Sequence, residues 1–360
     1  MAVVTSAMHI KRGTIPIFFR TGLMVILLII TIPLTAQDNR DVSIPLDHFY
    51  AKPVNGGLRN FFSKFYFSLS TGYGQTFYKQ DLSEFALLQQ PDSMPVIFNG
   101  TEGVPGSING YRYWFNRAEP SGSRTYSPGS DFLVNGDSTD LAFKGTGWSI
   151  PLNLNVHYEF NRYKVGGGFM IEYHRPGEMG PNSFTDRINS YSPDFNSTFY
   201  KKYYFLFGAK VYRYQYYVLS ADVRIGGWSL SRKFDKTQIS RGIYFNLGVT
   251  LERELSQYVR VFMRPSYDFK TFTLNMPEGG QSLKTNMNAF YVQLGITYRI
   301  PRLKRCFIKE CRTQINHQHG NMEYRSRVHP WYKNQNPHHG ENYPTLIKYK
   351  GRNKKKMNPY

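Results

Sequence analysis

The sequence predicts an all-β chain: an eight-stranded antiparallel up-and-down transmembrane β-barrel, followed by a mostly irregular basic C-terminal tail. Three observations support this prediction: an alternating pattern of apolar and polar residues, an aromatic-rich composition, and connections that are short and long in turn. The alternation runs unbroken through "IPLNLNVHYEF", residues 150–160, and a period of two places the two kinds of side chain on opposite faces of a strand. The 28 Tyr and 27 Phe suit the aromatic girdles of a membrane barrel.

Eight segments carry this alternation, and most of them follow one another as hairpins. Each is near or above the roughly 9–11 residues that a tilted strand needs to cross a bilayer, and an even number of strands suits closure. The predicted strands cover residues 64–74, 150–160, 163–173, 203–212, 214–227, 242–252, 258–269 and 288–299.

The connections alternate in length as strictly as the side chains alternate in polarity. Those after the second, fourth and sixth strands span only a few residues, whereas the others cover about 74–145, 174–198, 229–239 and 270–285. Bacterial outer-membrane barrels combine tight periplasmic turns with long external loops in this way. A soluble periplasmic sandwich, the alternative for alternating strands, has no reason to segregate its loops.

With these strands and loops, residues 60 to 299 resemble the eight-stranded outer-membrane barrels of the OmpA/OmpX-like type. The resemblance is architectural and implies a bacterial outer-membrane location with both chain ends in the periplasm. One feature departs from it, because such barrels often finish on an aromatic residue, whereas Tyr298 is followed by about sixty more residues.

The N-terminus reads as an export signal. Lys11, Arg12 and Arg20 are followed by the apolar run "GLMVILLIITIPL", and Ala36 offers a small residue at a cleavage site. A transmembrane anchor is the alternative, but the run is shorter than the roughly 20 residues of a spanning helix. The predicted organisation is therefore a signal peptide (1–36), a periplasmic segment (37–60), a barrel (61–299) and a periplasmic tail (300–360).

The polar rows that face away from lipid would fill the lumen. Because an eight-stranded barrel is just wide enough for its side chains to fill, these residues predict a packed network of ion pairs rather than an open pore. The predicted lumen residues are His157, Glu159, Lys164, Glu172, Lys210, Asp222, Arg224, Glu252, Arg260, Arg264, Asp268, Gln293 and Arg299.

Two histidines raise the question of catalysis. His157 lies two residues before Glu159, and His174 lies two residues after Glu172, so each pair shares a strand face and could touch. Some small outer-membrane barrels are hydrolases or acyltransferases, but neither pair has a nucleophile at a fixed spacing. The sequence therefore predicts a non-enzymatic protein with no catalytic residues, and a barrel hydrolase or acyltransferase is the alternative.

The first long loop is rich in Gly, Ser, Pro and Asp. Loops of this length are functional or disordered. In a surface receptor or adhesin, "YRYWF" would serve as an aromatic contact patch; otherwise the loop is a variable surface decoration. The residues of this predicted patch are Tyr111, Tyr113, Trp114 and Phe115.

The tail after Pro301 loses the alternation and has fourteen Lys and Arg against three Asp and Glu. A basic, weakly apolar segment is extended until it binds an acidic partner. Export excludes nucleic acid, so the expected partners, besides outer-membrane lipid, are an acidic periplasmic protein, a lipoprotein or peptidoglycan. The predicted contact residues are Arg302, Lys304, Arg305, Arg325, Arg327, Lys348, Lys350, Arg352, Lys354, Lys355 and Lys356. This predicts an anchor or an accessory subunit of a secretion or surface-assembly machine.

The start of the tail holds the only two cysteines, Cys306 and Cys311. In an oxidising compartment a nearby pair favours a disulfide. With His317 and His319 they also form a C-x4-C-x5-H-x-H array that could bind zinc, although the two histidines are closer in sequence than in a standard finger. No other cofactor is expected.

Overall fold

The computed structural model describes residues 52–53, 57–99, 109–256, 258–277, 280–311, 317–320 and 322–325. The predicted signal peptide 1–36 lies outside the described residues, as do Arg327 and the tail cations from Lys348 to Lys356. No helix within the described ranges is long and apolar enough to span a membrane.

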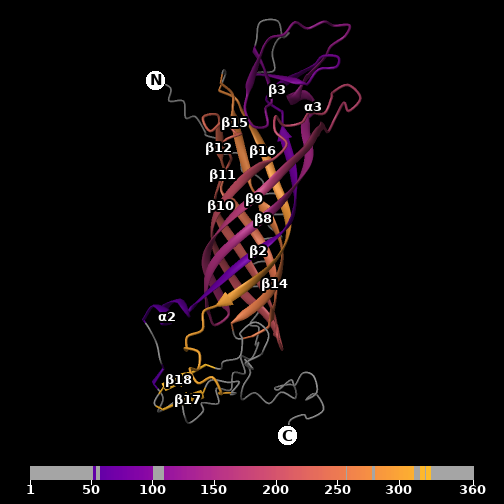
Figure 1. Ribbon diagram of the computed structural model, residues 1–360. Coiled ribbons are helices and arrows are strands. Elements are labelled where there is room, and N and C mark those ends of the chain that lie inside the picture. The colour runs from indigo at the N-terminus through magenta and orange to yellow at the C-terminus, as the bar shows by residue number, and fades with distance from the viewer. Residues whose placement is uncertain are drawn as a thin grey trace, which may run out of the picture. The chain divides into compact units, whose positions relative to one another are not determined.

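Eight long strands close into an antiparallel barrel (Figure 1), which confirms the predicted fold. Each strand pairs with its neighbours along the chain, and the last pairs back onto the first, with Val292 opposite Tyr73. The barrel strands are β2 (Phe65–Asp81), β8 (Ala142–Phe160), β9 (Tyr163–Pro181), β10 (Thr198–Tyr214), β11 (Tyr217–Ser229), β13 (Tyr244–Glu254), β14 (Val259–Phe269) and β16 (Ser282–Arg299).

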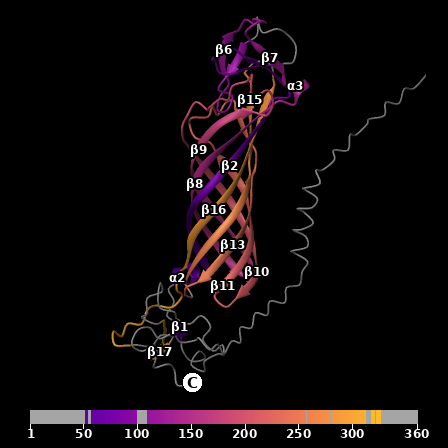
Figure 2. The same cartoon turned by 90° about the vertical axis from the view of Figure 1, so that its right-hand side faces the viewer.

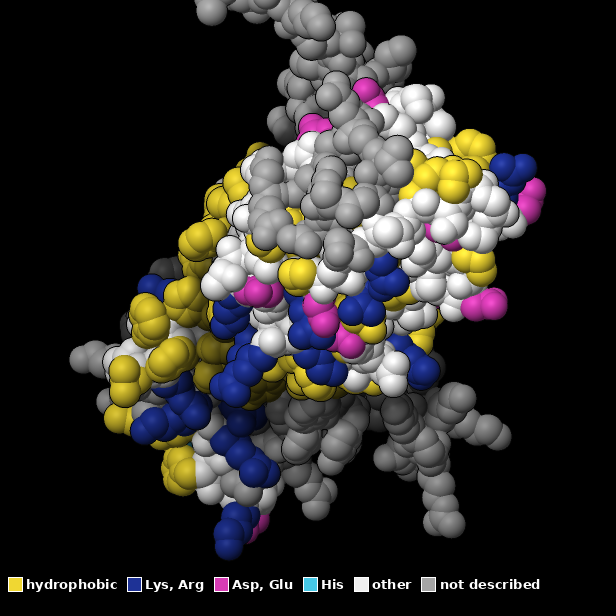
Figure 3. Space-filling model, turned by 90° about the horizontal axis from the view of Figure 1, so that it is seen from above, with side chains coloured by type: hydrophobic (Ala, Val, Ile, Leu, Met, Phe, Trp, Pro, Cys, Tyr) yellow, Lys and Arg dark blue, Asp and Glu magenta, His cyan; other side chains and the backbone are white. Residues whose placement is uncertain are grey.

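Apolar side chains face outward from the barrel and polar ones face inward. Leu154 is 52% exposed and Phe205 is 71% exposed, whereas Asn153 and Gln293 are fully buried. In water such an exposed apolar belt would be very costly, but against lipid it is the expected outer surface. The chain is therefore a transmembrane β-barrel of the outer-membrane type, and hydrophobic side chains along its flank are visible from above (Figure 3).

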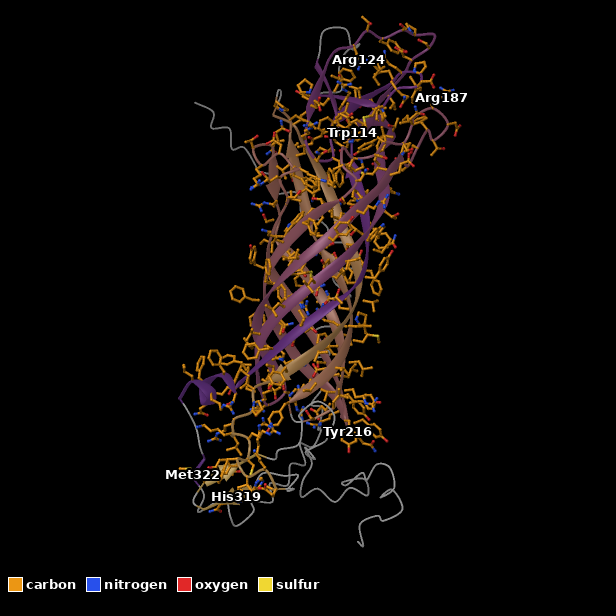
Figure 4. All side chains as sticks on the ribbon, in the orientation of Figure 1. Trp114, Arg124, Arg187, Tyr216, His319 and Met322 are labelled. Carbon is orange, nitrogen blue, oxygen red and sulfur yellow. The ribbon has the colours of Figure 1, made fainter. Side chains whose placement is uncertain are left out.

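Tight turns connect the barrel strands at one end. Asn161 has a φ of 50° and Gln215 a φ of 49°, the left-handed conformation that reverses the chain in a few residues and that Asn tolerates well. Tyr216 marks this end of the barrel in Figure 4.

At the other end several strands extend further than the sequence predicted. β2 continues to Asp81 and β8 begins at Ala142, so the first long connection spans 82–141 rather than 74–145. β9 likewise runs to Pro181 instead of ending near residue 173. The outward row there contains exposed polar residues such as Lys79 and Lys144, so the polarity alternation fades while the hydrogen-bonded ladder continues.

The described residues of the first long loop, 85–99 and 109–139, form a small folded unit, here called the cap. Its sheet has the order β6-β5-β4-β3-β7 and stands at the long-loop end of the barrel (Figure 2). The elements are β3 (Phe85–Gln89), β4 (Val96–Asn99), β5 (Asn109–Arg112), β6 (Glu119–Ser123), β7 (Phe132–Asn135) and helix α3 (Gly136–Thr139). Two further strands, β12 (Ile239–Arg241) and β15 (Thr271–Asn275), extend the barrel sheet beside β16.

Beyond the short-turn end, residues before and after the barrel meet in a three-stranded sheet, here called the C-terminal sheet. It consists of β1 (Lys52–Pro53), β17 (His317–His319) and β18 (Met322–Tyr324). Helix α2 (Gly57–Phe62) leads from β1 into the barrel, and Arg59 Nη1 donates a hydrogen bond to the carbonyl of Leu303 at 3.2 Å. The described part of the tail is thus more regular than the sequence predicted.

Candidate functional site

The barrel interior holds three layers of charged side chains. The layer nearest the short turns is built around two glutamates. Glu159 accepts hydrogen bonds from Lys210 Nζ at 2.7 Å and from Arg260 Nη1 at 2.8 Å. Glu252 accepts from Arg260 Nη1 at 3.2 Å and from Lys164 Nζ. Lys164 Nζ also lies 3.9 Å from Glu159 Oε1, so three cations surround Glu159 and two contact Glu252, which offsets part of the cost of removing these charges from water.

The middle layer is an arginine–aspartate pair with polar supports. Arg264 donates from Nε and Nη2 to Asp222 Oδ1 at 2.8 and 2.5 Å, and the Thr250 hydroxyl donates to Asp222 Oδ2 at 2.7 Å. Arg224 Nε lies 3.7 Å from the same carboxylate, and Asn246 Oδ1 accepts from Arg264 Nη2 at 2.5 Å. Charge-assisted bonds of this kind fix side-chain geometry strongly.

The layer toward the cap is centred on a fully buried lysine. Lys202 Nζ lies 2.5 Å from Glu172 Oε2 and 2.7 Å from Asp268 Oδ2. The Tyr291 hydroxyl donates to Glu172 Oε1 at 2.7 Å, and Lys270 Nζ lies 3.6 Å from Glu172 Oε2. One lysine therefore joins carboxylates from two strands that are far apart in sequence.

Lys202 and Lys270 were absent from the predicted lumen set. Both lie at even spacing from residues of that set, since Lys202 is eight residues before Lys210 and Lys270 is two after Asp268. The prediction misses them because its strands begin at Tyr203 and end at residue 269. The structure places the predicted lumen residues on the inner face, with Arg299 at the short-turn rim, where its Nε donates to the carbonyl of Ser63 at 2.7 Å.

Little free volume remains between the two layers nearer the short turns. A cavity of about 30 Å³ lies among polar side chains that include Ser68, Asn155 and Thr297, room for only about two waters.

Each of the two histidine–glutamate pairs lies on one strand face as predicted. His157 Nε2 is 3.5 Å from Glu159, and His174 Nδ1 is 3.7 Å from Glu172.

An aromatic core closes the long-loop end of the barrel. Trp114 packs on Tyr191 with ring centroids 4.4 Å apart and meets Phe143 edge-on at 5.8 Å. The ring of Phe115 meets that of Phe272 edge-on, with centroids 5.9 Å apart. Burial among these rings raises the pKa of the Tyr191 hydroxyl. Figure 4 labels Trp114 at the junction of the cap and the barrel.

This core corrects the predicted contact patch. Tyr111, Trp114 and Phe115 are buried and Tyr113 is half-buried, so "YRYWF" does not form an exposed surface. Periodicity could not reveal this, because the partners of these rings come from the barrel strands and three other loops.

Hydrogen bonds tie the cap to the loop between β11 and β12. Asn116 Nδ2 donates to the carbonyl of Lys233 at 2.9 Å, and the Ala118 N–H donates to Gln238 Oε1 at 2.9 Å. In the same loop, hydrogen bonds from Thr237 lower the pKa of Asp235. The cap is therefore held by polar contacts as well as by its apolar core.

The short-turn end carries exposed cations beside exposed apolar side chains. Arg302, Lys304 and Arg305, three of the predicted contact residues, are exposed, and Arg325 is half-buried. The exposed apolar side chains of α2 and of the segment before the C-terminal sheet are Leu58, Phe61, Phe62 and Phe307.

Four predicted ligand residues of the tail come together where the segment after the barrel meets the C-terminal sheet. The candidate ligand atoms of Cys306, Cys311, His317 and His319 all lie within 4.8 Å of one another. Cys311 Sγ lies 3.2 Å from His317 Nε2. The disulfide between Cys306 and Cys311 that the sequence favours stays a prediction.

No protein-family model and no curated protein matches the chain. Solved structures similar to it include the outer-membrane protease OmpT from Escherichia coli, with 13% identity over 69% of this chain and 97% of that one and a TM-score of 0.30. The outer-membrane protein OprG from Pseudomonas aeruginosa has 8% identity over 65% and 96%, with a TM-score of 0.31. The outer-membrane protein AlkL, determined in DMPC lipid bilayers, has 12% identity over 67% and 93%, with a TM-score of 0.28.

Proposed function

We propose that the chain is a non-enzymatic, non-conducting outer-membrane anchor, and that its basic C-terminal segment binds an acidic cell-envelope partner in the periplasm. The observation that carries this proposal is the filled barrel interior. Charged layers occupy the lumen, and the aromatic core closes one mouth. A barrel built in this way leaves its two ends as the surfaces available for function.

The chemistry of the short-turn end favours this end over the cap. Arg302, Lys304 and Arg305 are consecutive or nearly so and all exposed, and Phe307 beside them is 64% exposed. Cations around an apolar side chain fit a protein or lipoprotein surface that is acidic and partly apolar. The carboxylates of peptidoglycan would bind to the cations but would make no use of the exposed Phe307.

The absence of enzymatic activity is part of the proposal. The rings of His157 and His174 are buried within the network. Each contacts a glutamate that is itself paired with cations, an arrangement that stabilises charge in the lumen. The hydroxyl of Tyr78 contacts His174 Nε2, but Tyr78 is buried in the aromatic core, whereas a hydrolase would need its nucleophile to be accessible to substrate.

The test is in-cell photo-crosslinking from two matched aromatic positions. A photoreactive phenylalanine analogue replaces Phe307 at the C-terminal end or Phe184 at the cap end, where the native ring is 41% exposed. We expect Phe307 to yield one adduct with an acidic envelope protein, lipoprotein or peptidoglycan fragment, identified by mass spectrometry, and Phe184 to yield none.

Charge reversal shows whether the Phe307 adduct depends on binding to the neighbouring cations or only on proximity to the partner. Changing Arg302, Lys304 and Arg305 to Glu should abolish the Phe307 adduct because the attraction becomes repulsion. A matched triple change of the exposed residues Lys79, Lys144 and Lys284 to Glu alters the net charge equally and should leave it intact. An adduct that survives the first change and is lost with the second would contradict the proposal.

A second candidate function is surface binding or adhesion through the cap. It is favoured by the second small core of the cap, in which Leu88, Val96 and Phe98 pack together, separately from the core that closes the barrel mouth. A loop that only closed the barrel would not need this extra sheet. An adduct from Phe184 with an external ligand and none from Phe307 would support adhesion instead.

A further inference from the structure

Four side chains converge at the C-terminal sheet from two separate segments of the chain. Cys306 and Cys311 flank the turn that follows the barrel, and His317 and His319 lie two residues apart on β17, so their side chains share one face. The bond from the Cys306 N–H to the carbonyl of Arg325, at 3.0 Å, holds the first segment against the end of β18.

The four groups are the ligands that zinc prefers. Zinc in structural sites is four-coordinate and tetrahedral, with Zn–S bonds of about 2.3 Å and Zn–N bonds of about 2.0 Å. Ligand atoms around such an ion are therefore separated by about 3.3–3.8 Å. The 3.2 Å between Cys311 Sγ and His317 Nε2 is already close to this range, and the widest separation in the cluster is at most 4.8 Å.

A second observation points to a ligand at this place. His319 Nε2 is buried and has no hydrogen-bond partner within the described residues. A buried imidazole nitrogen without a partner loses its bond to water and gains nothing in return. The ring also packs against Phe307 and Tyr324, with centroids at 5.9 and 6.2 Å, so its orientation is fixed by contacts other than a metal.

We propose that Cys306, Cys311, His317 and His319 bind one Zn²⁺ ion as a structural site. On binding, the two thiols lose their protons to solvent, and the resulting thiolates and the two neutral imidazoles each give one electron pair to the ion. The ion joins the segment after the barrel to β17. A Cys306–Cys311 disulfide would remove both sulfur ligands, so the two states exclude each other.

Metal binding is tested on the full-length protein, purified in detergent without added metal or chelator. Elemental analysis should give about one zinc per chain. After removal of zinc and reduction of the thiols, titration with Co²⁺ should produce thiolate-to-cobalt charge-transfer absorption and the intense visible bands of a tetrahedral site, and Zn²⁺ should displace both. No partner is required, so this result does not depend on the proposed docking function.

Three variants decide whether these residues form the site. Cys306→Ser should abolish the charge-transfer absorption, and His319→Ala should weaken Co²⁺ binding by more than about tenfold, the smallest loss seen when even a supporting hydrogen bond of a metal ligand is removed. Gln318→Ala is the control, because this residue lies between the two histidines on the opposite face of β17. Its spectrum and its zinc content should be unchanged.

Two results would overturn the proposal. One is a protein isolated with unreactive cysteines that become alkylated only after reduction, which would establish the disulfide. The other is an octahedral cobalt spectrum that all three variants share, which would mean adventitious binding elsewhere in the chain.

Discussion

The membrane part of the barrel and its cap end are built from the same strands, but the apolar face of the strands points outward in the first region and inward in the second. In the membrane part of β2, Leu69 faces lipid and Ser70 is buried inside. Near the cap on the same strand, Lys79 faces outward and Tyr78 packs into the aromatic core. The strand keeps its period of two while the polarity of its two faces is reversed.

The difference follows from the solvent outside. Where lipid surrounds the barrel, the outward apolar side chains contact lipid. The interior is then filled by polar groups that must pair with one another. Where the outside is water, the interior is apolar and gains from burial as in a soluble protein. The stability of the first region therefore depends on pairing, and that of the second depends on packing.

The largest effect is expected from breaking the pairing around Lys202. Lys202→Met has a similar volume but leaves Glu172 and Asp268 without their shared cation, and uncompensated buried charge costs about 3–5 kcal/mol. Urea unfolding in detergent micelles, followed by the gel mobility of heated and unheated samples, should report a lower free energy of unfolding. A variant as stable as the native protein would mean that the network is not a stabilising element.

The next effect concerns the outer face. Leu154→Arg places a charge on the lipid-facing surface of β8, where the cost is about 2–4 kcal/mol at mid-membrane. Thr146→Arg on the exposed part of the same strand should stay within about 0.5 kcal/mol, as for ordinary surface changes. Reconstitution into vesicles at graded urea measures both, and equal costs would contradict the assignment of where lipid ends along β8.

The smallest effect is expected in the cap. Ile97→Val removes one methylene group from a fully buried position of β4, at a cost of about 0.5–1.5 kcal/mol. The loss should appear as faster proteolysis within residues 82–141, while the barrel keeps its heat-modifiable mobility on gels. A change in barrel stability of the same size would mean that the cap and the barrel unfold as one unit.

Much of the barrel was readable from the sequence, because the face of each residue depends only on parity along a strand. The alternation of inward and outward positions placed Asp222, Arg264 and Glu252 inside the barrel. The same alternation predicted the eight strands. It failed at the strand ends near the cap, where polar outward residues such as Lys144 hide the alternation, and it missed Lys202 for the same reason.

Only the tertiary structure decided which groups meet. Lys202 joins Glu172 and Asp268 because the register of neighbouring strands brings three strands to one level of the barrel, and no local pattern encodes that register. Trp114 is buried because distant loops supply its neighbours. Cys306 and His319 are brought together by the pairing of β17 with β18 and by the bond from Cys306 to Arg325. The sequence by itself determined on which strand face each residue lies, because that depends only on a local period of two. Which side chains contact one another was decided by the tertiary structure, because the contacts join strands and loops that are far apart in the chain.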